Sequence, residues 1–376
     1  MGNILILGGG FGGLIIAEQL AASLDSSHTI TLVSPNRQFT FYPALVHLAF
    51  GECEPDDIVF DLSNKLKTLG VRFIQGEMVR LDAENKTVEI AGDDVNGEIA
   101  YDYIVVAIGR RLATEQVPGF FEYADHLLGT NAALEFGEAV KDFKKGRIVV
   151  GSCLNSQLPV PACEAAFALA NRFRSRIAEG SVEIELIFPE SLDTAFGGAS
   201  LQRELVDAFQ RNNINTHFHA SIIEVTPESV LCGKDLHFNY DLLMLIPPFR
   251  GNASLRNAGI TDNSDFVKVD DLMKIRGLDN SYAVGDIVAF SGPKLAHMAA
   301  RQAQVAAANL LSELDGKKPE EHYYHEIATI IDAGGSDSIY LHYGIWDDSM
   351  YRLKKGRLWA WAKEAHDAWW QARHRK

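Results

Sequence analysis

Hydrophobic residues gather in short runs along this chain, and the runs alternate with segments of helical periodicity. The first run covers residues 3–7, a glycine-rich turn and a helical pattern over residues 14–24 follow it, and a second run lies at 29–33. Short apolar runs bounded by turns predict buried strands. Further helices are expected over residues 162–174 and over the alanine-rich residues 295–311. Further strands are expected at residues 71–75, 87–90, 102–108, 147–151, 183–188, 242–246 and 281–284.

This alternation of strands and helices indicates the α/β class, with parallel sheets. The chain has 376 residues, which suggests two or three domains at about 150 residues each. Strand–helix units begin near residues 3 and 147, so we expect two Rossmann-like dinucleotide-binding domains, the first of them discontinuous. The expected boundaries are 1–112 and 253–314 for the first domain, 113–252 for the second, and 315–376 for a C-terminal region.

Composition narrows the range of partners. The formal net charge of −15 argues against nucleic acid, because phosphate binding needs a basic surface. Four cysteines form no CxxC pair, which favours a reducing, cytoplasmic compartment over a disulfide scaffold. No run approaches the ~18 to 20 apolar residues of a membrane span. The apolar residues 4–17 are broken by glycines and lack a basic leader, so we do not interpret them as a signal peptide.

The N-terminal turn carries a phosphate-binding pattern. Gly8, Gly10 and Gly13 fit the spacing GxGxxG, with Phe11 between the second and third glycines. The first glycine permits a tight turn, the second lets the backbone approach a pyrophosphate, and the third lets helix and strand pack closely. The helix N-terminus then stabilises the anion. Because the pattern follows a strand and opens a helix, it predicts a bound dinucleotide.

The second strand departs from the usual pattern. The acidic residue that grips a ribose hydroxyl about 20 positions after the glycines is missing, and the strand ends instead at Ser34, Pro35 and Asn36. Ser34 and Asn36 can form hydrogen bonds with a ribose without carrying charge. We therefore expect these two residues to replace the acid.

Two later segments resemble motifs of two-dinucleotide-binding-domain flavoproteins. Residues 102–109 resemble the strand that ends in Ala-Thr-Gly, here as Ala107, Ile108 and Gly109. Residues 282–286 resemble the motif whose aspartate, here Asp286 after Gly285, contacts the ribityl and pyrophosphate part of FAD in that family. The resemblance implies that the cofactor is FAD on the first domain. We expect it to bind non-covalently through the Gly8–Gly13 turn, although the sequence alone leaves covalent attachment open.

Within these flavoproteins the chain is similar to sulfide:quinone reductases and flavocytochrome c sulfide dehydrogenases. The similarity includes residues 41–45, 246–251 and 293–295. It implies that Lys294 lies near the flavin pyrimidine ring, where an ammonium stabilises the negative charge of reduced flavin. The candidate cofactor contacts are Gly8, Gly10, Phe11, Gly13, Ser34, Asn36, Pro43, Ala107, Gly109, Arg110, Gly285, Asp286 and Lys294.

The second domain lacks a glycine-rich cradle for a nicotinamide cofactor. Residues 151–159 contain one glycine, and prolines stand at positions 159 and 161. A type II NADH dehydrogenase should carry a second GxGxxG here. We therefore expect NADH and NADPH to be poor reductants, and keep the type II enzyme as the alternative.

The redox cysteines of the resembled family are missing where they are expected. Their counterparts are Leu158 and Thr329, and a family histidine corresponds to Ala195. The catalytic candidates are Lys294, Glu164 and Cys163, and no metal site is expected. Cys163 could also pair with Cys153, Cys53 lies just past the flavin-side segment, and a buried cysteine is usually a small apolar filler. The electron donor is expected to be a small molecule, with a sulfur compound as one option.

The C-terminal residues differ from the remainder of the chain. Residues 352–376 hold eight Lys/Arg against two acids and four of the five tryptophans. Five apolar residues fall on one helical face: Leu358, Trp361, Ala365, Trp369 and Ala372. A basic helix with an aromatic face predicts peripheral, monotopic binding to an anionic membrane surface, here on its cytoplasmic side. The alternative is a helix that docks on the protein's own core or forms a dimer contact.

The patterns predict an FAD oxidoreductase, and the resemblance implies that it passes electrons from a small donor to a membrane quinone. Two other hypotheses remain open at this stage. One is a type II NADH:quinone dehydrogenase, and the other is a non-catalytic FAD-binding scaffold protein.

Overall fold

The computed structural model describes residues 2–92, 95–233, 235–334, 338–347 and 349–375. Its first sheet is parallel and has five strands, with β1 in the centre. The order across the sheet is β19 (Ser281–Ala283), β9 (Tyr103–Val106), β1 (Asn3–Leu7), β2 (Thr29–Ser34) and β5 (Arg72–Gln75). Four of the five β1 residues are buried, as expected for a strand covered on both faces. The parallel α/β fold is thus confirmed.

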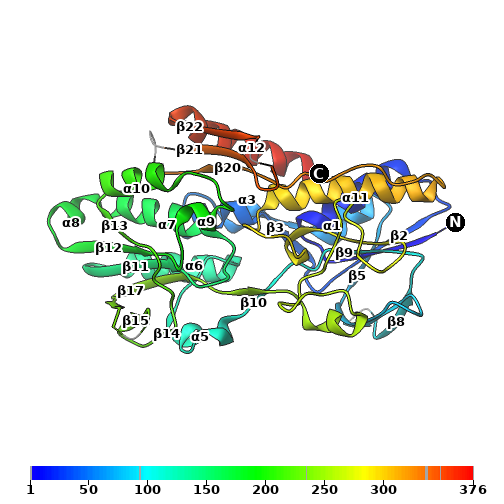
Figure 1. Cartoon of the computed structure of the whole chain (residues 1–376), viewed down its shortest axis with the longest axis horizontal. Coiled ribbons are helices and arrows are strands. Elements are labelled where there is room, and N and C mark those ends of the chain that lie inside the picture. The colour runs from blue at the N-terminus through cyan, green and yellow to red at the C-terminus, as the bar shows by residue number, and fades with distance from the viewer. Residues whose placement is uncertain (1, 93–94, 234, 335–337, 348, 376) are drawn as a thin grey trace.

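Helices α1 (Phe11–Ser23) and α11 (Ala296–Leu314) pack against each other beside this sheet (Figure 1). The predicted strand at 87–90 is real, but it lies outside the parallel sheet. As β7 it belongs to an antiparallel sheet of three strands: β6 (Glu77–Asp82), β7 (Thr87–Ala91) and β8 (Gly97–Ala100). A short antiparallel pair, β3 (Gln38–Thr40) and β4 (Val59–Asp61), follows β2.

A second parallel sheet lies in the other half of the molecule (Figure 1). Its strands, in spatial order, are β13 (Ile214–His217), β12 (Val182–Ile187), β11 (Gly146–Ser152) and β17 (Leu242–Ile246). The helices of this half include α5 (Phe120–Tyr123), α6 (Thr130–Asp142), α7 (Pro159–Arg172), α8 (Arg174–Ala178), α9 (Leu192–Ala195) and α10 (Gln202–Arg211). A small meander adds β14 (Glu224–Val225), β15 (Ser229–Leu231) and β16 (His237–Asn239).

The chain passes between the two halves at one antiparallel pair, β10 (Arg111–Leu112) with β18 (Phe249–Arg250). The crossings lie close to the predicted boundaries at residues 112 and 252. The division into domains itself stays a prediction, although each parallel sheet draws its strands from one of the predicted domains.

The C-terminal region forms an antiparallel sheet and a long helix, which lie across the top of the view in Figure 1. The elements are β20 (Glu326–Ile331), β21 (Ile339–Gly344), β22 (Tyr351–Lys355) and α12 (Arg357–His374). Strand β20 contacts α7 of one half and α11 of the other, so this region joins both halves. Within the described residues, no helix combines the length and the apolar character needed to cross a bilayer.

Candidate functional site

The three glycines of the N-terminal turn differ in the space that surrounds them. A Cβ atom on Gly8, whose φ is +104°, would lie 2.2 Å from the carbonyl oxygen of Ala107. A Cβ on Gly13 would lie 1.9 Å from the carbonyl oxygen of Gly8. At Gly10 a Cβ would meet no heavy atom within 4 Å. Gly8 and Gly13 therefore allow the close approach of strands and helix, whereas Gly10 leaves open space at the start of α1.

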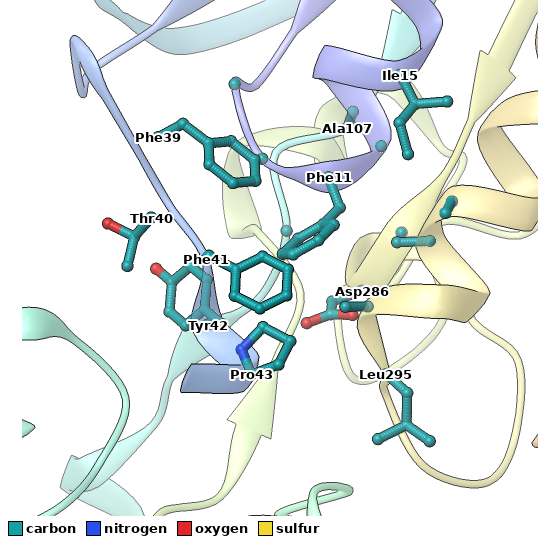
Figure 2. A pocket seen from close by; sticks show the side chains of 18 of the residues that line it. Phe11, Ile15, Phe39, Thr40, Phe41, Tyr42, Pro43, Ala107, Asp286 and Leu295 are labelled. Carbon is teal, nitrogen blue, oxygen red and sulfur yellow. The ribbon is translucent and has the colours of Figure 1, made fainter. Parts of the chain in front are cut away.

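That open space belongs to a cavity of 1520 Å³ at the junction of the two halves and the C-terminal region. Typical small-molecule pockets measure roughly 300–1,000 Å³, so this cavity can hold a dinucleotide and a second molecule. Figure 2 shows Phe11, Phe41 and Pro43 on one side of the cavity and Asp286 and Leu295 on the other. All of the candidate cofactor residues except Gly13 line the cavity.

The carboxyl ends of three parallel strands meet at this cavity, as expected for a Rossmann-like domain. Ser34 ends β2, and its hydroxyl accepts a hydrogen bond from the backbone N–H of Asn36 at 3.3 Å. Gly109 follows β9 and Gly285 follows β19, both with positive φ. These positions are those expected for contacts with ribose and pyrophosphate, and the individual contacts stay predictions.

An ion pair crosses the cavity wall between Arg110 and Asp286. Arg110 Nη1 donates to Asp286 Oδ2 at 2.7 Å, and both side chains are at least four-fifths buried. The guanidinium lies 4.2 Å from the centre of the Phe249 ring. Its buried Nε has no hydrogen-bond partner among the described residues. A buried donor without a partner is costly, so this atom fits an acceptor that a bound ligand supplies.

Lys294 is the second cation at the cavity. Its Nζ donates to the carbonyl of Val288, lies 3.5 Å from that of Phe290, and sits 4.6 Å from the centre of the Phe266 ring. The side chain is 7% exposed, and no carboxylate of the described residues lies within ion-pair distance. Burial lowers the pKa of this ammonium to about 8, against the opposing effect of nearby acids. A buried ammonium without a carboxylate suits an anionic ligand.

A buried ion pair lies further along the cavity, between Glu164 on α7 and Lys363 on α12. The same Glu164 oxygen accepts a hydrogen bond from the backbone N–H of Asp332 at 2.9 Å. Burial opposes the charge of Lys363, but the Glu164 carboxylate outweighs it and leaves the pKa of Lys363 raised. Burial also raises the pKa of Asp367, one turn further along α12. Carboxyl and ammonium groups able to exchange protons therefore face this part of the cavity.

The third catalytic candidate, Cys163, does not line the cavity. Its side chain is 0% exposed and packs in the hydrophobic core, and burial raises the pKa of its thiol. All four cysteines are free, so Cys153 and Cys163 form no pair. The counterparts of the family cysteines, Leu158 and Thr329, do line the cavity. We therefore remove Cys163 from the catalytic candidates, because its thiol does not reach the cavity and its raised pKa keeps it protonated.

Helix α12 docks on the protein's own core, which is one of the arrangements that the sequence left open. Trp370 is 6% exposed and packs against three aromatic rings, with centroid distances of 4.8 Å to Phe11, 5.4 Å to Phe39 and 5.0 Å to Phe41. On the predicted apolar face, Trp361 is 66% exposed. Leu358, Trp369, Ala365 and Ala372 are exposed as well. The helix therefore docks on the protein with one face and leaves its apolar face uncovered.

Sequence reasoning missed the docked face of α12. It consists of Lys363, Asp367, Trp370 and His374, and His374 Nδ1 lies 2.6 Å from a carboxylate oxygen of Glu18 on α1. The spacings of 4, 3 and 4 residues place these side chains on one helical face, and this periodicity was the available signal. The apolar positions 358, 361, 365, 369 and 372 predict the same helix equally well, and they suggested a different contact face.

The family model described as pyridine nucleotide-disulphide oxidoreductase matches residues 2–303, which is more than half of the chain. The chain belongs to the pyridine nucleotide-disulphide oxidoreductase family. This membership confirms the predicted FAD-dependent oxidoreductase, because proteins of the family that resemble this chain are FAD-binding flavoproteins. The open space at Gly10 and the unpartnered Nε of Arg110 fit that cofactor.

Three proteins that this flavoprotein resembles have names that include a quinone. It is 21% identical over 337 residues to the mitochondrial sulfide:quinone oxidoreductase of Mus musculus, across 85% of this chain and 73% of that protein. It is 23% identical to the type II NADH:quinone oxidoreductase of Haemophilus influenzae, across 88% and 85%. The solved sulfide:quinone oxidoreductase of Aquifex aeolicus matches with a TM-score of 0.92 at 23% identity, and the match covers 100% of this chain and 92% of that one. This structural likeness confirms the predicted fold.

Proposed function

We propose that this flavoprotein passes electrons from a small donor through FAD to a membrane quinone, as a peripheral protein on the cytoplasmic side of the membrane. The observation that carries the proposal is the single cavity that extends from the Gly8–Gly13 turn to the Glu164–Lys363 pair under α12. Such a cavity offers one region for FAD and a second region, at the membrane-facing helix, for the acceptor. Relatives named for quinone reduction support the acceptor class.

The residues of the first region are suited to bind and orient FAD. Bound FAD supplies the two-electron chemistry between donor and acceptor. Gly10 gives the pyrophosphate access to the N-terminus of α1, whose dipole favours negative charge. Arg110 and Lys294 bring two positive charges to the cavity wall, where low polarity strengthens their effect on an anionic ligand.

The residues of the second region are suited to deliver protons. Reduction of a quinone to a quinol consumes two electrons and two protons. Lys363 Nζ carries a proton at neutral pH, because its pKa is raised, and Glu164 holds that ammonium in place. Asp367, with a raised pKa, lies on the same face of α12. We assign to Lys363 the proton donation to the acceptor oxygen, and to Asp367 the return of a proton from solvent.

The start of α7 argues against a pyridine nucleotide as the donor. A nucleotide pyrophosphate would meet the first N–H groups of this helix. Pro159 and Pro161 lack an N–H, so Val160 is the only one of the first three helical residues with a donor. The type II NADH dehydrogenase therefore remains the less favoured candidate, although such enzymes are among the relatives.

Among the described residues that line the cavity there is no cysteine. Leu158 and Thr329 occupy the positions of the cysteine pair in the resembled family, and neither side chain can form a bond to sulfur. We propose that a small donor reacts directly at the flavin. The non-catalytic hypothesis is less favoured, because the family model that matches this chain describes oxidoreductases.

The uncovered face of α12 supports membrane binding. Leu358, Trp361 and Trp369 are each more than half exposed. Basic residues flank them on β22 and at the start of α12. Burial of tryptophan faces at ~25 cal/mol per Å² contributes a few kcal/mol, and each basic residue near an anionic surface adds about 1 kcal/mol. These terms together are sufficient for peripheral binding.

Anaerobic mixing of the purified holoprotein with sulfide and, separately, with NADH tests the proposal through the flavin absorbance. We expect NADH at micromolar concentration to leave the flavin oxidised over minutes. Bleaching by NADH within seconds would replace our proposal with the type II dehydrogenase. Failure of every donor to support steady-state turnover with a quinone, despite bound FAD, would favour the scaffold hypothesis.

A further inference from the structure

The loop between β11 and α7, residues 153–158, holds two segments of the FAD site in place. In a Rossmann-like domain this first strand–helix loop normally receives a dinucleotide. Here the carbonyl of Asn155 accepts a hydrogen bond from Phe249 N at 3.0 Å, and the carbonyl of Gln157 accepts one from Lys294 N at 2.7 Å. The Gln157 side-chain amide also donates to Gly292 O at 3.2 Å. Gln157 thus forms hydrogen bonds with both end residues of the segment 292–294.

The two residues that accept these bonds have left-handed backbones. The φ angle is +64° at Asn155 and +47° at Gln157. Residues other than glycine rarely adopt this conformation, and it persists only where the surrounding structure holds it. The loop keeps an unfavourable conformation at the two positions whose carbonyls contact the FAD side, which indicates that these contacts determine its shape.

Each contact leads to one of the two cations of the cavity. Gln157 holds the main chain of Lys294, whose ammonium lines the cavity. Asn155 holds the main chain of Phe249, and the Phe249 ring lies under the guanidinium of Arg110. The loop of the second half therefore positions both positive charges at the cofactor region of the first.

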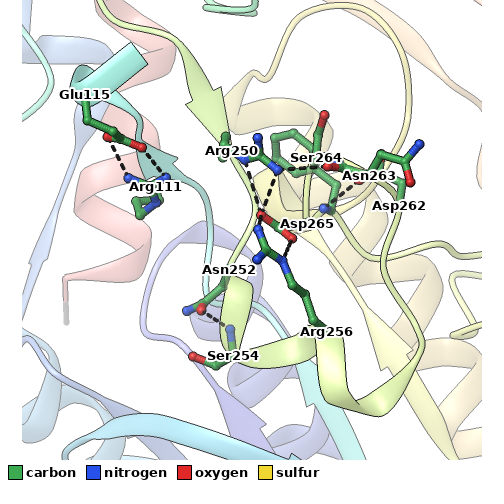
Figure 3. Close-up of polar contacts among 11 residues, drawn as sticks. Arg111, Glu115, Arg250, Asn252, Ser254, Arg256, Asp262, Asn263, Ser264 and Asp265 are labelled. Carbon is green, nitrogen blue, oxygen red and sulfur yellow. Dashed lines mark hydrogen bonds and ion pairs between the residues drawn. The ribbon is translucent and has the colours of Figure 1, made fainter.

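The Phe249 segment is also fixed from its other side. Figure 3 shows Arg250 and Arg256 converging on Asp265. Their Nη2 atoms lie 3.0 and 2.7 Å from Asp265 Oδ2, and the Asp265 side chain is 4% exposed. Because this anchor already secures Phe249, the position of Lys294 depends more on the loop than the position of Arg110 does. Replacement of Gln157 should therefore change the position of Lys294 at the cavity.

We infer that Gln157 is a positioning residue that fixes Lys294 beside the cofactor and thereby raises the reduction potential of bound FAD. A positive charge close to the cofactor favours the state that carries more electrons, and the size of this effect depends on distance. The inference rests on FAD binding at this site and is independent of the donor and the acceptor. It assigns to the loop of residues 153–158 a role in cofactor tuning.

The test is a double-mutant cycle on the FAD-loaded protein, read as the midpoint potential of the flavin. Gln157→Ala removes the bond to Gly292 and should lower the potential by up to about 30 mV, a tenfold change for a two-electron couple. In a Lys294→Met background the same substitution should produce no further shift. Gln157→Gly, which adopts positive φ freely, serves as the second variant should Gln157→Ala fold poorly. FAD content is measured in every variant.

Asn213→Ala is the matched control. Asn213 has a φ of +55° in the same half of the molecule and does not line the cavity, so its replacement should change thermal stability and leave the potential unchanged. An unaltered potential in both Gln157 variants, or an equal shift in the Lys294→Met background, would overturn the inference. Loss of FAD from the wild-type protein would instead contradict the cofactor assignment, so the two failures are distinguishable.

Discussion

Two glycines of the N-terminal turn should respond to substitution in opposite ways. Gly13→Ala places a methyl group 1.9 Å from the Gly8 carbonyl oxygen, so strand and helix must move apart. Overpacking of this kind costs about 1–3 kcal/mol or more. Gly10→Val, although larger, extends into open space from a backbone with φ −79° and ψ −164°, which any residue adopts. The apoprotein should therefore keep its stability within about 0.5 kcal/mol.

FAD binding should show the reverse sensitivity at Gly10. A valine side chain would occupy the space that the pyrophosphate needs. Loss of two hydrogen bonds to a charged group, at about 1.5–3 kcal/mol each, would weaken FAD binding at least about 100-fold. Urea unfolding of the apoproteins measures the first effect, and fluorescence titration with FAD measures the second. A Gly10→Val protein that purifies with a full flavin complement would refute the reasoning, as would a Gly13→Ala protein as stable as the wild type.

Three further predictions follow from the site. Burial lowers the pKa of Lys294 to about 8, although the nearby Asp286 and Asp262 oppose this shift. The ammonium is therefore charged below that pH and loses its charge above it, so the flavin potential should fall more steeply with pH above about 8. Potentiometry of Lys294→Met should show no such change of slope. Cys163→Ala should leave quinone reductase activity close to that of the wild type, because the buried thiol does not line the cavity, and a loss of about tenfold or more would restore the cysteine to the catalytic set. Replacement of the exposed Leu358, Trp361 and Trp369 by serine should leave FAD bound but abolish co-sedimentation with anionic liposomes, which in the wild-type protein should weaken at high salt without vanishing. Equal sedimentation of both forms would contradict membrane binding through this face of α12.

The sequence predicted the parts of the fold that local patterns encode. Buried strands such as residues 3–7 and 242–246 are continuous apolar runs, and the glycine spacing of the turn determines how strand and helix meet. The strands of the C-terminal sheet were not predicted, because none has a continuous buried run: β20 and β21 mix buried with half-buried residues, and β22 contains no buried residue. The strand at 87–90 was predicted, but no local pattern indicates which sheet a strand joins.

The site was predictable only where a residue lies next to a motif. Asp286 and Lys294 were selected through segments that resemble family motifs, and both line the cavity; their contacts with FAD stay predictions. Lys363 could not be selected in this way, since its partner Glu164 lies 199 residues away and the pairing depends on how α12 docks. Likewise, the left-handed backbone of Gln157 arises from its contacts with the segment 292–294, and no local sequence pattern predicts this conformation.

The transfer of electrons from FAD to a quinone is tested most directly without any natural donor. The purified holoprotein is photoreduced anaerobically, then mixed in separate experiments with a short-chain quinone and with NAD⁺, and the flavin absorbance is followed. Our account predicts complete reoxidation by the quinone within seconds, slowed at least about tenfold in a Lys363→Met protein, and no reoxidation by NAD⁺. A flavin that stays reduced with the quinone, or that is reoxidised by NAD⁺, would contradict it.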